Sequence, residues 1–307
     1  MIATARRLFV LRLARATSRS RPAVADQHIA LLTIGGLLAV NQMVLAAGGH
    51  AFVGTCVDAV VLVLTLNLAA FLDDARGDRA TIEAFGALAL AATIPLAGAA
   101  LPLRHMSQSA GTLTIAFPVA ASTLYFASRR TIRLRPLFTR SAYALQVLAV
   151  LAAAMLGFCA FLLRAPELQT DHPGRAALGV VAVLVSAAVE ELLFRGVLQT
   201  TLTRVLGGTG VMLSIVVSAA LFTSFGWWML AALAATIVFA IVAPRGGLGS
   251  AFIAHAAFVI GAVLVWPAVF DHTRPNMVAA VPLGLVFSVA LVALVAGASR
   301  SRERTGV

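Results

Sequence analysis

Long apolar runs alternate along this chain with short breaks that contain arginine, glycine or proline. Ten runs are visible, at residues 29–47, 51–72, 81–102, 109–128, 141–163, 176–203, 209–226, 228–243, 248–269 and 278–298. Most have the roughly 20 residues that a helix needs to cross about 30 Å of hydrocarbon. They are apolar on every side, whereas the strands of a membrane barrel alternate apolar and polar positions. The pattern predicts an all-α fold, a polytopic transmembrane helix bundle of about ten spans.

One boundary between the runs is ambiguous. From Val211 to Val242 only Gly226 and the pair Trp227 and Trp228 interrupt the apolar sequence, so this stretch forms either two short spans or one kinked span. If this stretch forms two spans and the N-terminus is cytoplasmic, 18 arginines face the cytoplasm and four face outward. If it forms one span, 15 arginines face the cytoplasm and seven face outward. Because positive charge gathers on the cytoplasmic side, two spans are predicted, with the tryptophans at the outer interface.

Composition agrees with a membrane protein and excludes several other classes. The 307 residues are 61% hydrophobic and 11% charged, with a mean hydropathy of +0.97. A water-soluble fold, a collagen, a disordered chain and a disulfide-rich scaffold each need a different composition. The net charge of +11 comes from arginines that lie between the apolar runs, so it indicates membrane orientation and not nucleic-acid binding. The lipid bilayer is the predicted partner.

The charge distribution also predicts the organisation of the chain. Residues 1–28, with six arginines, and residues 299–307 form basic tails, and both termini are predicted to be cytoplasmic in a multi-pass protein of the cell (plasma) membrane. Between them we expect a five-span N-terminal bundle at 29–163 and a five-span core at 176–298. Cys56 and Cys159 fall within spans, where packing is their expected role.

Three charged side chains lie close together in the sixth span: Glu190, Glu191 and Arg195. Each costs about 2.5–3.5 kcal/mol near the membrane centre unless it is compensated. Glu191 and Arg195 are four residues apart, so they are expected to satisfy each other on one helix face. Glu190 points about 100° away and lacks such a partner on its own helix, so it must face a polar cavity or another span. Helix packing by the charges is the alternative interpretation.

One further acid and one histidine lie well inside spans. His255 is the histidine buried in the membrane, about seven residues from the cytoplasmic end of its span, and we expect it to share with Glu190 a cavity that opens toward the cytoplasm. Its alternative role is a packed, hydrogen-bonded histidine. Asp58 lies about 10 Å from the outer end of its span, where it is expected to reach interfacial water.

The string EELLFRGVLQT, from Glu190 to Thr200, resembles the first motif of the CPBP intramembrane proteases, which include type II CAAX prenyl endopeptidases and the bacteriocin-immunity (Abi) proteins. The resemblance covers roughly 176–269. Phe222 matches the phenylalanine of the second motif, but Gly226 replaces its histidine. His255 matches the histidine of the third motif, but Val259 replaces its asparagine.

This resemblance implies roles for particular residues. Glu190 would activate the attacking water, Glu191 with Arg195 would order the site, His255 would stabilise the tetrahedral oxyanion, and Phe222 would support the site. Thr223 or Ser224 are candidates to replace the missing polar groups. A divalent metal such as zinc is implied by the family only, with Glu190 and His255 as its ligands if a metal binds. The implied substrate is a membrane or prenylated peptide.

Three hypotheses follow for the function. The first is a CPBP-type intramembrane endopeptidase, a hydrolase in which a glutamate activates water. The second is a catalytically inactive relative that binds or scaffolds a membrane partner, which the replacements at Gly226 and Val259 favour. The third is a secondary transporter, since ten spans can form two five-span repeats around a midplane site. Its polar lining would be Asp58 and Asn67 on the second span, with Asn41 and Gln42 on the first.

Overall fold

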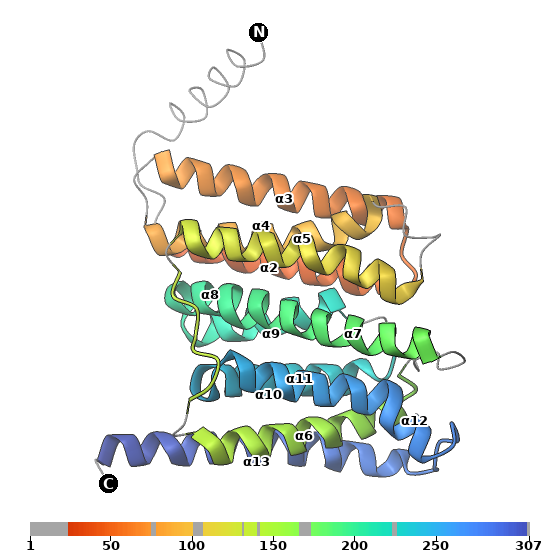
Figure 1. Ribbon diagram of the computed structural model, residues 1–307. Helices are drawn as coiled ribbons and strands as arrows, with labels where there is room; N and C mark the ends of the chain where they lie inside the picture. The colour runs from red at the N-terminus through yellow and green to blue at the C-terminus, as the bar shows by residue number, and fades with distance from the viewer. Residues whose placement is uncertain are drawn as a thin grey trace.

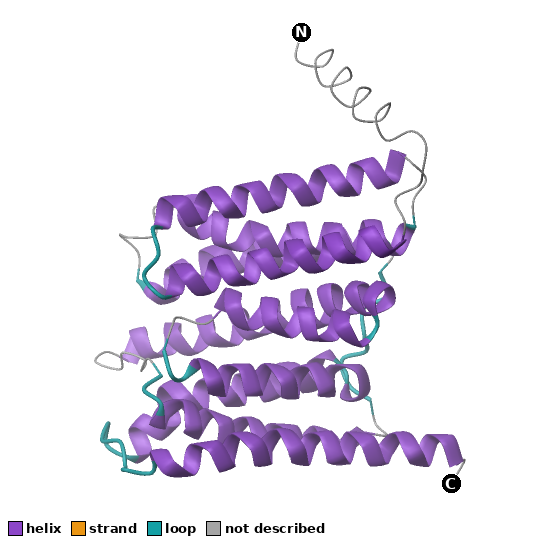
Figure 2. Ribbon diagram, turned by 180° about the vertical axis from the view of Figure 1, so that it is seen from behind, coloured by secondary structure: helices purple, strands orange, loops and turns teal. Residues whose placement is uncertain are grey.

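The computed structural model describes residues 24–74, 78–100, 107–130, 132–139, 142–165, 173–222 and 226–305. Throughout these ranges all regular structure is helical and no strand occurs, which confirms the predicted all-α bundle (Figures 1 and 2). The helices lie roughly side by side and successive membrane-crossing segments alternate in direction (Figure 1). The several long apolar helices identify the chain as a multi-pass helical membrane protein.

The helices follow the predicted apolar runs closely. The N-terminal half contains α2 (Val24–Ala46), α3 (Ala51–Asp74), α4 (Arg79–Ala100) and α5 (Gln108–Arg129). The C-terminal half contains α6 (Tyr143–Leu162), α7 (Pro173–Glu190), the π-helix η3 (Glu191–Leu198), α8 (Gln199–Leu206), α9 (Gly208–Phe222), α10 (Met229–Gly246), α11 (Leu248–Ile260), the π-helix η4 (Gly261–Val265), α12 (Trp266–Val269), the 3₁₀ turn η5 (Val278–Ala280) and α13 (Val281–Thr305). The segments α7, η3 and α8 form one continuous helix of 33 apolar-rich residues, Gly174–Leu206.

The described part of the chain contains nine helical segments that are long and apolar enough to cross a membrane. A tenth apolar helix, Gly208–Leu221, is shorter. It is separate from α10, and residues 226–228 turn between them, so the two-span interpretation of this region agrees with the structure. The short length of the tenth helix explains why this boundary was the ambiguous one in the sequence.

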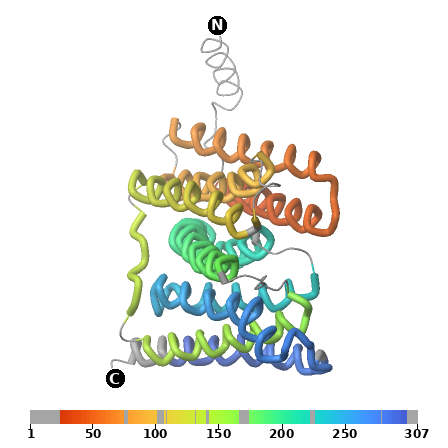
Figure 3. The backbone as a smooth tube through the Cα atoms, turned by 45° about the vertical axis from the view of Figure 1, so that its right-hand side comes forward, coloured from red at the N-terminus to blue at the C-terminus, as the bar shows by residue number. Residues whose placement is uncertain are grey.

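Two hydrophobic clusters hold the bundle together. The first joins α2, α3, α4 and α5 with η3, α8 and α9, and the second joins α6 with α10, α11 and α13. Figure 3 shows the same grouping as successive layers, with α6 beside α13 at the bottom of the view. The helix α6 therefore packs with the C-terminal half, although the predicted boundary between bundle and core lies after it, and that boundary stays a prediction.

The segment 132–139 connects these two groups along one end of the bundle (Figure 1). The carbonyls of Pro136 and Leu137 accept hydrogen bonds from the backbone N–H groups of Leu248 and Gly249, at 2.9 and 2.7 Å. These are the first N–H groups of α11, which have no partner within the helix. Gly247 adopts φ +97°, and a Cβ there would lie 2.5 Å from the Leu137 carbonyl oxygen, so only glycine fits this close approach.

We call the end of the bundle where α2 begins and α13 ends the terminal end, and the opposite end the distal end. The described arginines outside the candidate site are distributed unequally between them. Ten lie near the terminal end, at positions 79, 129, 130, 133, 135, 204, 245, 300, 302 and 304, and three near the distal end, at positions 164, 175 and 274. This asymmetry is the basis of the prediction that the terminal end is cytoplasmic.

Asp58 does not reach interfacial water, so that expectation is wrong. It is 1% exposed and lies between α2 and α3. Its Oδ1 accepts hydrogen bonds from the side-chain amides of Asn41 and Gln42 at 2.8 and 2.9 Å. Two amides from the preceding helix supply the hydrogen bonds that water would otherwise provide, so the carboxyl group can be buried. Cys56 and Cys159 are both free thiols.

Candidate active site

The charged motif coincides with a change in helix type. Glu190 is the last residue of α7, and Glu191 begins the π-helix η3, which also contains Arg195. Hydrogen bonds in a π-helix run from i to i+5, so each turn is wider than in an α-helix. Arg195 Nε lies 3.7 Å from Glu191 Oε2, within ion-pair range but without a hydrogen bond. The predicted ion pair between Glu191 and Arg195 therefore forms, but Nε and Oε2 do not form a hydrogen bond with each other.

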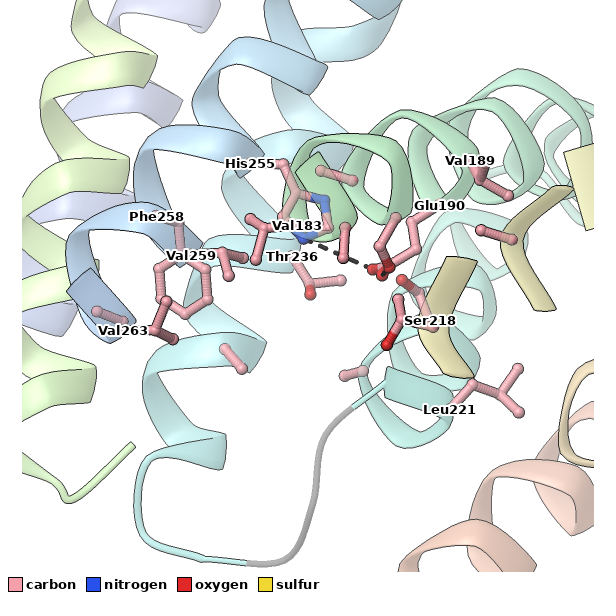
Figure 4. A pocket seen from close by; sticks show the side chains of 18 of the residues that line it. Val183, Val189, Glu190, Ser218, Leu221, Thr236, His255, Phe258, Val259 and Val263 are labelled. Atoms are coloured by element: carbon pink, nitrogen blue, oxygen red, sulfur yellow. Dashed lines mark hydrogen bonds and ion pairs between the residues drawn. The ribbon is translucent and has the colours of Figure 1, made fainter. Parts of the chain in front are cut away.

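His255 lies between the two glutamates. Its Nδ1 is 2.9 Å from Glu191 Oε1, and its Nε2 is 3.5 Å from Glu190 Oε2. The ring of Phe239 stacks against the imidazole, with 4.8 Å between centroids and 20° between planes. Figure 4 shows His255 pointing from α11 toward Glu190 across the cavity. The structure thus brings together the side chains of Glu190, Glu191 and His255, as the resemblance implies.

Glu190 has a partner on its own helix that the sequence reasoning missed. Ser186 Oγ donates a hydrogen bond to Glu190 Oε1 at 2.7 Å. Serine at position 186 is four residues before the glutamate, one α-helical turn away, so the spacing itself was a usable signal. With Oε1 occupied by Ser186, Oε2 is the oxygen that faces His255, and the Glu190 and His255 side chains remain 12% and 13% exposed.

Arg195 is anchored by neighbouring helices. The side chain is 1% exposed, Nη1 donates to Ser218 Oγ on α9 at 3.0 Å, and Nη2 donates to the Thr236 carbonyl on α10 at 3.4 Å. One turn further along, Gln199 donates to the Ala240 carbonyl on α10 at 3.0 Å. These contacts also escaped the sequence reasoning, although isolated polar residues in otherwise apolar spans were a signal for them.

A cavity of about 550 Å³ adjoins Glu190 and His255. Its walls come from α4, α5, α7, α9, α10, α11 and η4, with Arg195 of η3, and most of the lining residues are small or aliphatic. On α7 the lining runs from Glu190 back to Gly179, and on α11 from His255 onward to Val259 and into η4 at Val263. Both directions lead to the distal end. The cavity and the predicted cytoplasmic side therefore lie in opposite directions from the site, so the expected orientation and the expected cytoplasmic opening do not agree with each other.

The cavity ends at this level because side chains pack tightly on the terminal side of the charged residues. Leu193, Phe194 and Leu198 of η3 are fully buried on the terminal side of the two glutamates. Arg195 and Gln199 fill the space toward α10 with their hydrogen bonds to its carbonyls. No cavity can continue through this layer, whereas glycine and alanine line the opposite direction.

The positions where the sequence departs from the family motifs have different surroundings. Val259 forms part of the cavity wall one turn beyond His255. Gly226 lies in the turn between α9 and α10, where a Cβ would approach Trp228, itself a lining residue. Phe222 is the last residue of α9, but its side chain falls outside the described part of the structure. The candidate substitutes Thr223 and Ser224 also lie outside the described residues.

The donor atoms at the site do not fit a catalytic zinc ion. In the described residues no group of three or more His, Cys, Asp and Glu side chains is arranged to hold a metal. Ser186 and His255 already occupy one oxygen of Glu190 and one of Glu191, which leaves Glu190 Oε2 and His255 Nε2 to face the cavity. Catalytic zinc normally takes three protein ligands. The zinc implied by the resemblance thus lacks a third ligand here.

Arg135 in the 132–139 segment adds positive charge on the terminal side of the site. Burial, together with the nearby positive charge of Arg195, lowers the pKa of Arg135 to about 10, and Glu191 opposes this shift. The guanidinium therefore remains protonated at neutral pH. Two arginines, Arg135 and Arg195, thus lie near Glu191.

Fold and site together define a polytopic helical membrane protein with a carboxylate–imidazole–carboxylate group inside the bundle. Residues 172–261 match the family model described as Rce1-like, type II CAAX prenyl endopeptidase Rce1-like. This match confirms the resemblance over that segment and is consistent with a protease of the CPBP family. The matched segment contains Glu190, Glu191, Arg195 and His255. Searches of curated proteins and of solved structures found no match.

Proposed function

We propose that this protein is an intramembrane endopeptidase of the CPBP type, in which Glu190 activates water for attack on a peptide bond. The single observation that carries the proposal is the convergence of Glu190 and His255 on one cavity, with 3.5 Å between Oε2 and Nε2. A base for water and a donor for the developing oxyanion are the two groups that peptide hydrolysis requires. The family match over the same segment supports this assignment.

The reaction uses side chains alone. Water held at Glu190 Oε2 gives a proton to the carboxylate while its oxygen attacks the scissile carbonyl carbon. The tetrahedral oxyanion accepts a hydrogen bond from His255 Nε2 in the doubly protonated form of the ring. The protonated Glu190 then passes its proton to the leaving amine nitrogen, and the C–N bond breaks. One water is consumed, and the products are a carboxylic acid and an amine.

Glu191 and Ser186 act as positioning residues in this scheme. Glu191 Oε1 accepts a hydrogen bond from His255 Nδ1 at 2.9 Å, which directs Nε2 toward Glu190 and the cavity. Such an orienting carboxylate fixes the ring of a functional histidine. Ser186 holds Oε1 of Glu190 and leaves Oε2 for water. Arg195 keeps the charge of Glu191 compensated in a buried environment.

The substrate that fits this cavity is an apolar peptide segment in the membrane. The lining offers aliphatic and small side chains, with a few hydroxyl groups such as Ser109 and Thr112 along α5. Apolar walls with a few polar groups are typical of binding sites that take a largely apolar ligand. None of the residues that line it identifies a prenyl group specifically.

An inactive relative that binds a membrane partner is the competing function. Val259 in the cavity wall favours it, because a valine cannot supply the polar group that the family motif has there. The transporter hypothesis gains no such support. Asp58 is enclosed by Asn41 and Gln42, and the Asn67 amide donates to the carbonyl of Val63 on its own helix, so this cluster does not line the cavity.

Substitution of Glu190 by glutamine separates the two leading functions. Glu190→Gln keeps the size of the side chain and an acceptor for Ser186, so the protein should accumulate in the membrane at the wild-type level. Cleavage of a membrane-anchored reporter peptide by the purified protein in detergent should fall at least ~100-fold, because the base is lost. Equal cleavage by the variant and the wild type would refute catalysis by Glu190, and absence of cleavage by both would favour the inactive relative.

A further inference from the structure

The geometry points to a substrate that reaches Glu190 and His255 from the outer face of the membrane, as an apolar segment of an exported or membrane-anchored polypeptide. This inference rests on the proposed function for the nature of the ligand, and on the cavity and the arginine distribution for the direction of access. It differs from the access route that we expected from the sequence.

The first support is the level of the cavity within the bundle. Most of the wall lies on the distal side of the site, from Ser109 to Val119 on α5, Gly179 to Ala187 on α7, and Trp228 to Thr236 at the start of α10, and Arg195 bounds the cavity on the terminal side. Ala165, which follows α6 at the distal end, also lines the cavity. At about 1.5 Å per residue, the lining along α7 from Glu190 to Gly179 spans roughly 16 Å. That distance is about half of the hydrocarbon thickness.

The second support is the closure of the terminal side. Arg195 and Gln199 form hydrogen bonds with α10 carbonyls, and the side chains of Leu193, Phe194 and Leu198 are fully buried there. The 132–139 segment then covers the start of α11 with two backbone hydrogen bonds. A peptide that approached from this end would have to break these contacts.

The third support is the orientation of the bundle. Arginine is concentrated at the terminal end in the described residues, and the basic N-terminal tail adds to it in the full sequence. By the positive-inside rule the terminal end is cytoplasmic, so the distal end and the cavity face outward. The chemical class of substrate follows: a segment that has been translocated across or inserted into the membrane, with its scissile bond in the outer half of the bilayer.

Side-specific thiol labelling tests the direction of access independently of catalysis. In a background with Cys56→Ala and Cys159→Ala, single cysteines are introduced along α5 by Ser109→Cys, Ala116→Cys and Ser128→Cys. Ser109 and Ala116 line the cavity, about 10 Å apart along the helix, and Ser128 is exposed near the terminal end. A charged, membrane-impermeant maleimide is applied to intact cells or to inside-out vesicles.

The expected result is modification of Ser109→Cys and Ala116→Cys from the outside and of Ser128→Cys from the inside. Phe117→Cys is the matched control, because Phe117 lies at the same depth but is 63% exposed on the outer surface of the bundle, where lipid excludes the charged reagent. Modification of Ala116→Cys only from the inside would overturn the inference. The inference would also be overturned if Ala116→Cys reacted from neither side in the folded protein while its thiol reacted after denaturation.

A second variant protects the test against misfolding. Ala182→Cys places a thiol on α7, in another wall of the cavity, and should give the same labelling pattern as Ala116→Cys. The cleavage assay in detergent is insensitive to membrane side, so the two proposals fail separately. Outward labelling without Glu190-dependent cleavage removes the protease assignment, and cleavage with inward labelling removes the outer access route.

Discussion

Arg195 offers the sharpest test of how the charged motif is held in the bundle. The side chain is 1% exposed, and its three neighbours are Glu191, Ser218 and the Thr236 carbonyl. Arg195→Met keeps the length and apolar volume of the side chain but removes the positive charge. Glu191 then keeps its hydrogen bond from His255 but loses the cation that is 3.7 Å from its Oε2.

The magnitude follows from the burial of the pair. Removal of one partner of a buried ion pair leaves an uncompensated charge and costs about 3–5 kcal/mol. Replacement of both partners by neutral groups is far less costly, because no charge remains to be desolvated. We therefore expect Arg195→Met alone to lower stability by about 3–5 kcal/mol, and the double variant Glu191→Gln/Arg195→Met to recover most of this loss. The amide oxygen that Glu191→Gln introduces still accepts a hydrogen bond from His255 Nδ1.

Thermal unfolding of the purified variants in one detergent, at one scan rate, measures this difference. At roughly 2 °C per kcal/mol for a chain of this size, Arg195→Met should melt about 6–10 °C below the wild type. The matched control is Arg204→Met on the same helix, because the Arg204 side chain is 43% exposed and Glu83 keeps its second ion pair, with Arg79, so the loss should be about 1 kcal/mol or less. A wild-type melting temperature for Arg195→Met, or a double variant that is no more stable than the single one, would refute the reasoning.

Two further predictions concern hydrogen bonds to carboxyl groups. Ser186→Ala removes the 2.7 Å hydrogen bond to Glu190. Because a hydrogen bond to a charged group contributes about 1.5–3 kcal/mol, reporter cleavage should fall about 10- to 100-fold. Ser186→Thr keeps the hydroxyl group and should retain activity. Equal rates for Ser186→Ala and wild type would show that Ser186 does not position the base. Asp58→Ala leaves the amide of Gln42 without its acceptor, at a cost of about 1–3 kcal/mol, while Asn41 keeps its hydrogen bond to the Gly54 carbonyl. The melting temperature should therefore fall while cleavage per folded molecule is retained. Loss of cleavage in the folded Asp58→Ala protein would contradict a purely structural role.

Much of the fold could be predicted from the sequence because lipid imposes a simple rule. A segment that crosses hydrocarbon must satisfy its backbone within a helix and must be apolar, so the runs themselves mark the helices. The region from Val211 to Val242 shows the limit of this rule. There the turn after Phe222 carries no charge, and the distribution of arginine elsewhere in the chain had to decide between one span and two.

The site was only partly predictable, for physical reasons that differ between residues. The cost of burying charge identified Glu190, Glu191 and Arg195 as special, but their mutual geometry depends on the π-helix η3, which no periodicity in the sequence revealed. The approach of His255 to both glutamates depends on how α11 packs against α7, a tertiary contact. The direction of the cavity depends on where small residues from several helices meet in the folded bundle, which is a tertiary property.

The wide turn η3 also constrains the length of the helix that carries the motif. A π-turn contains about one more residue than an α-turn, so α8 is rotated by about 100° relative to a straight α-helical continuation of α7. This rotation directs Gln199 to the Ala240 carbonyl and Arg204 to Glu83. Conversion of η3 to a regular α-helix with the same number of residues would turn both side chains away from their partners, whereas deletion of one residue within 191–198 would remove the wide turn and keep their directions. The wide turn and the extra residue therefore compensate each other, and we expect relatives that lack the π-helix to have one residue fewer between the glutamates and the position of Gln199.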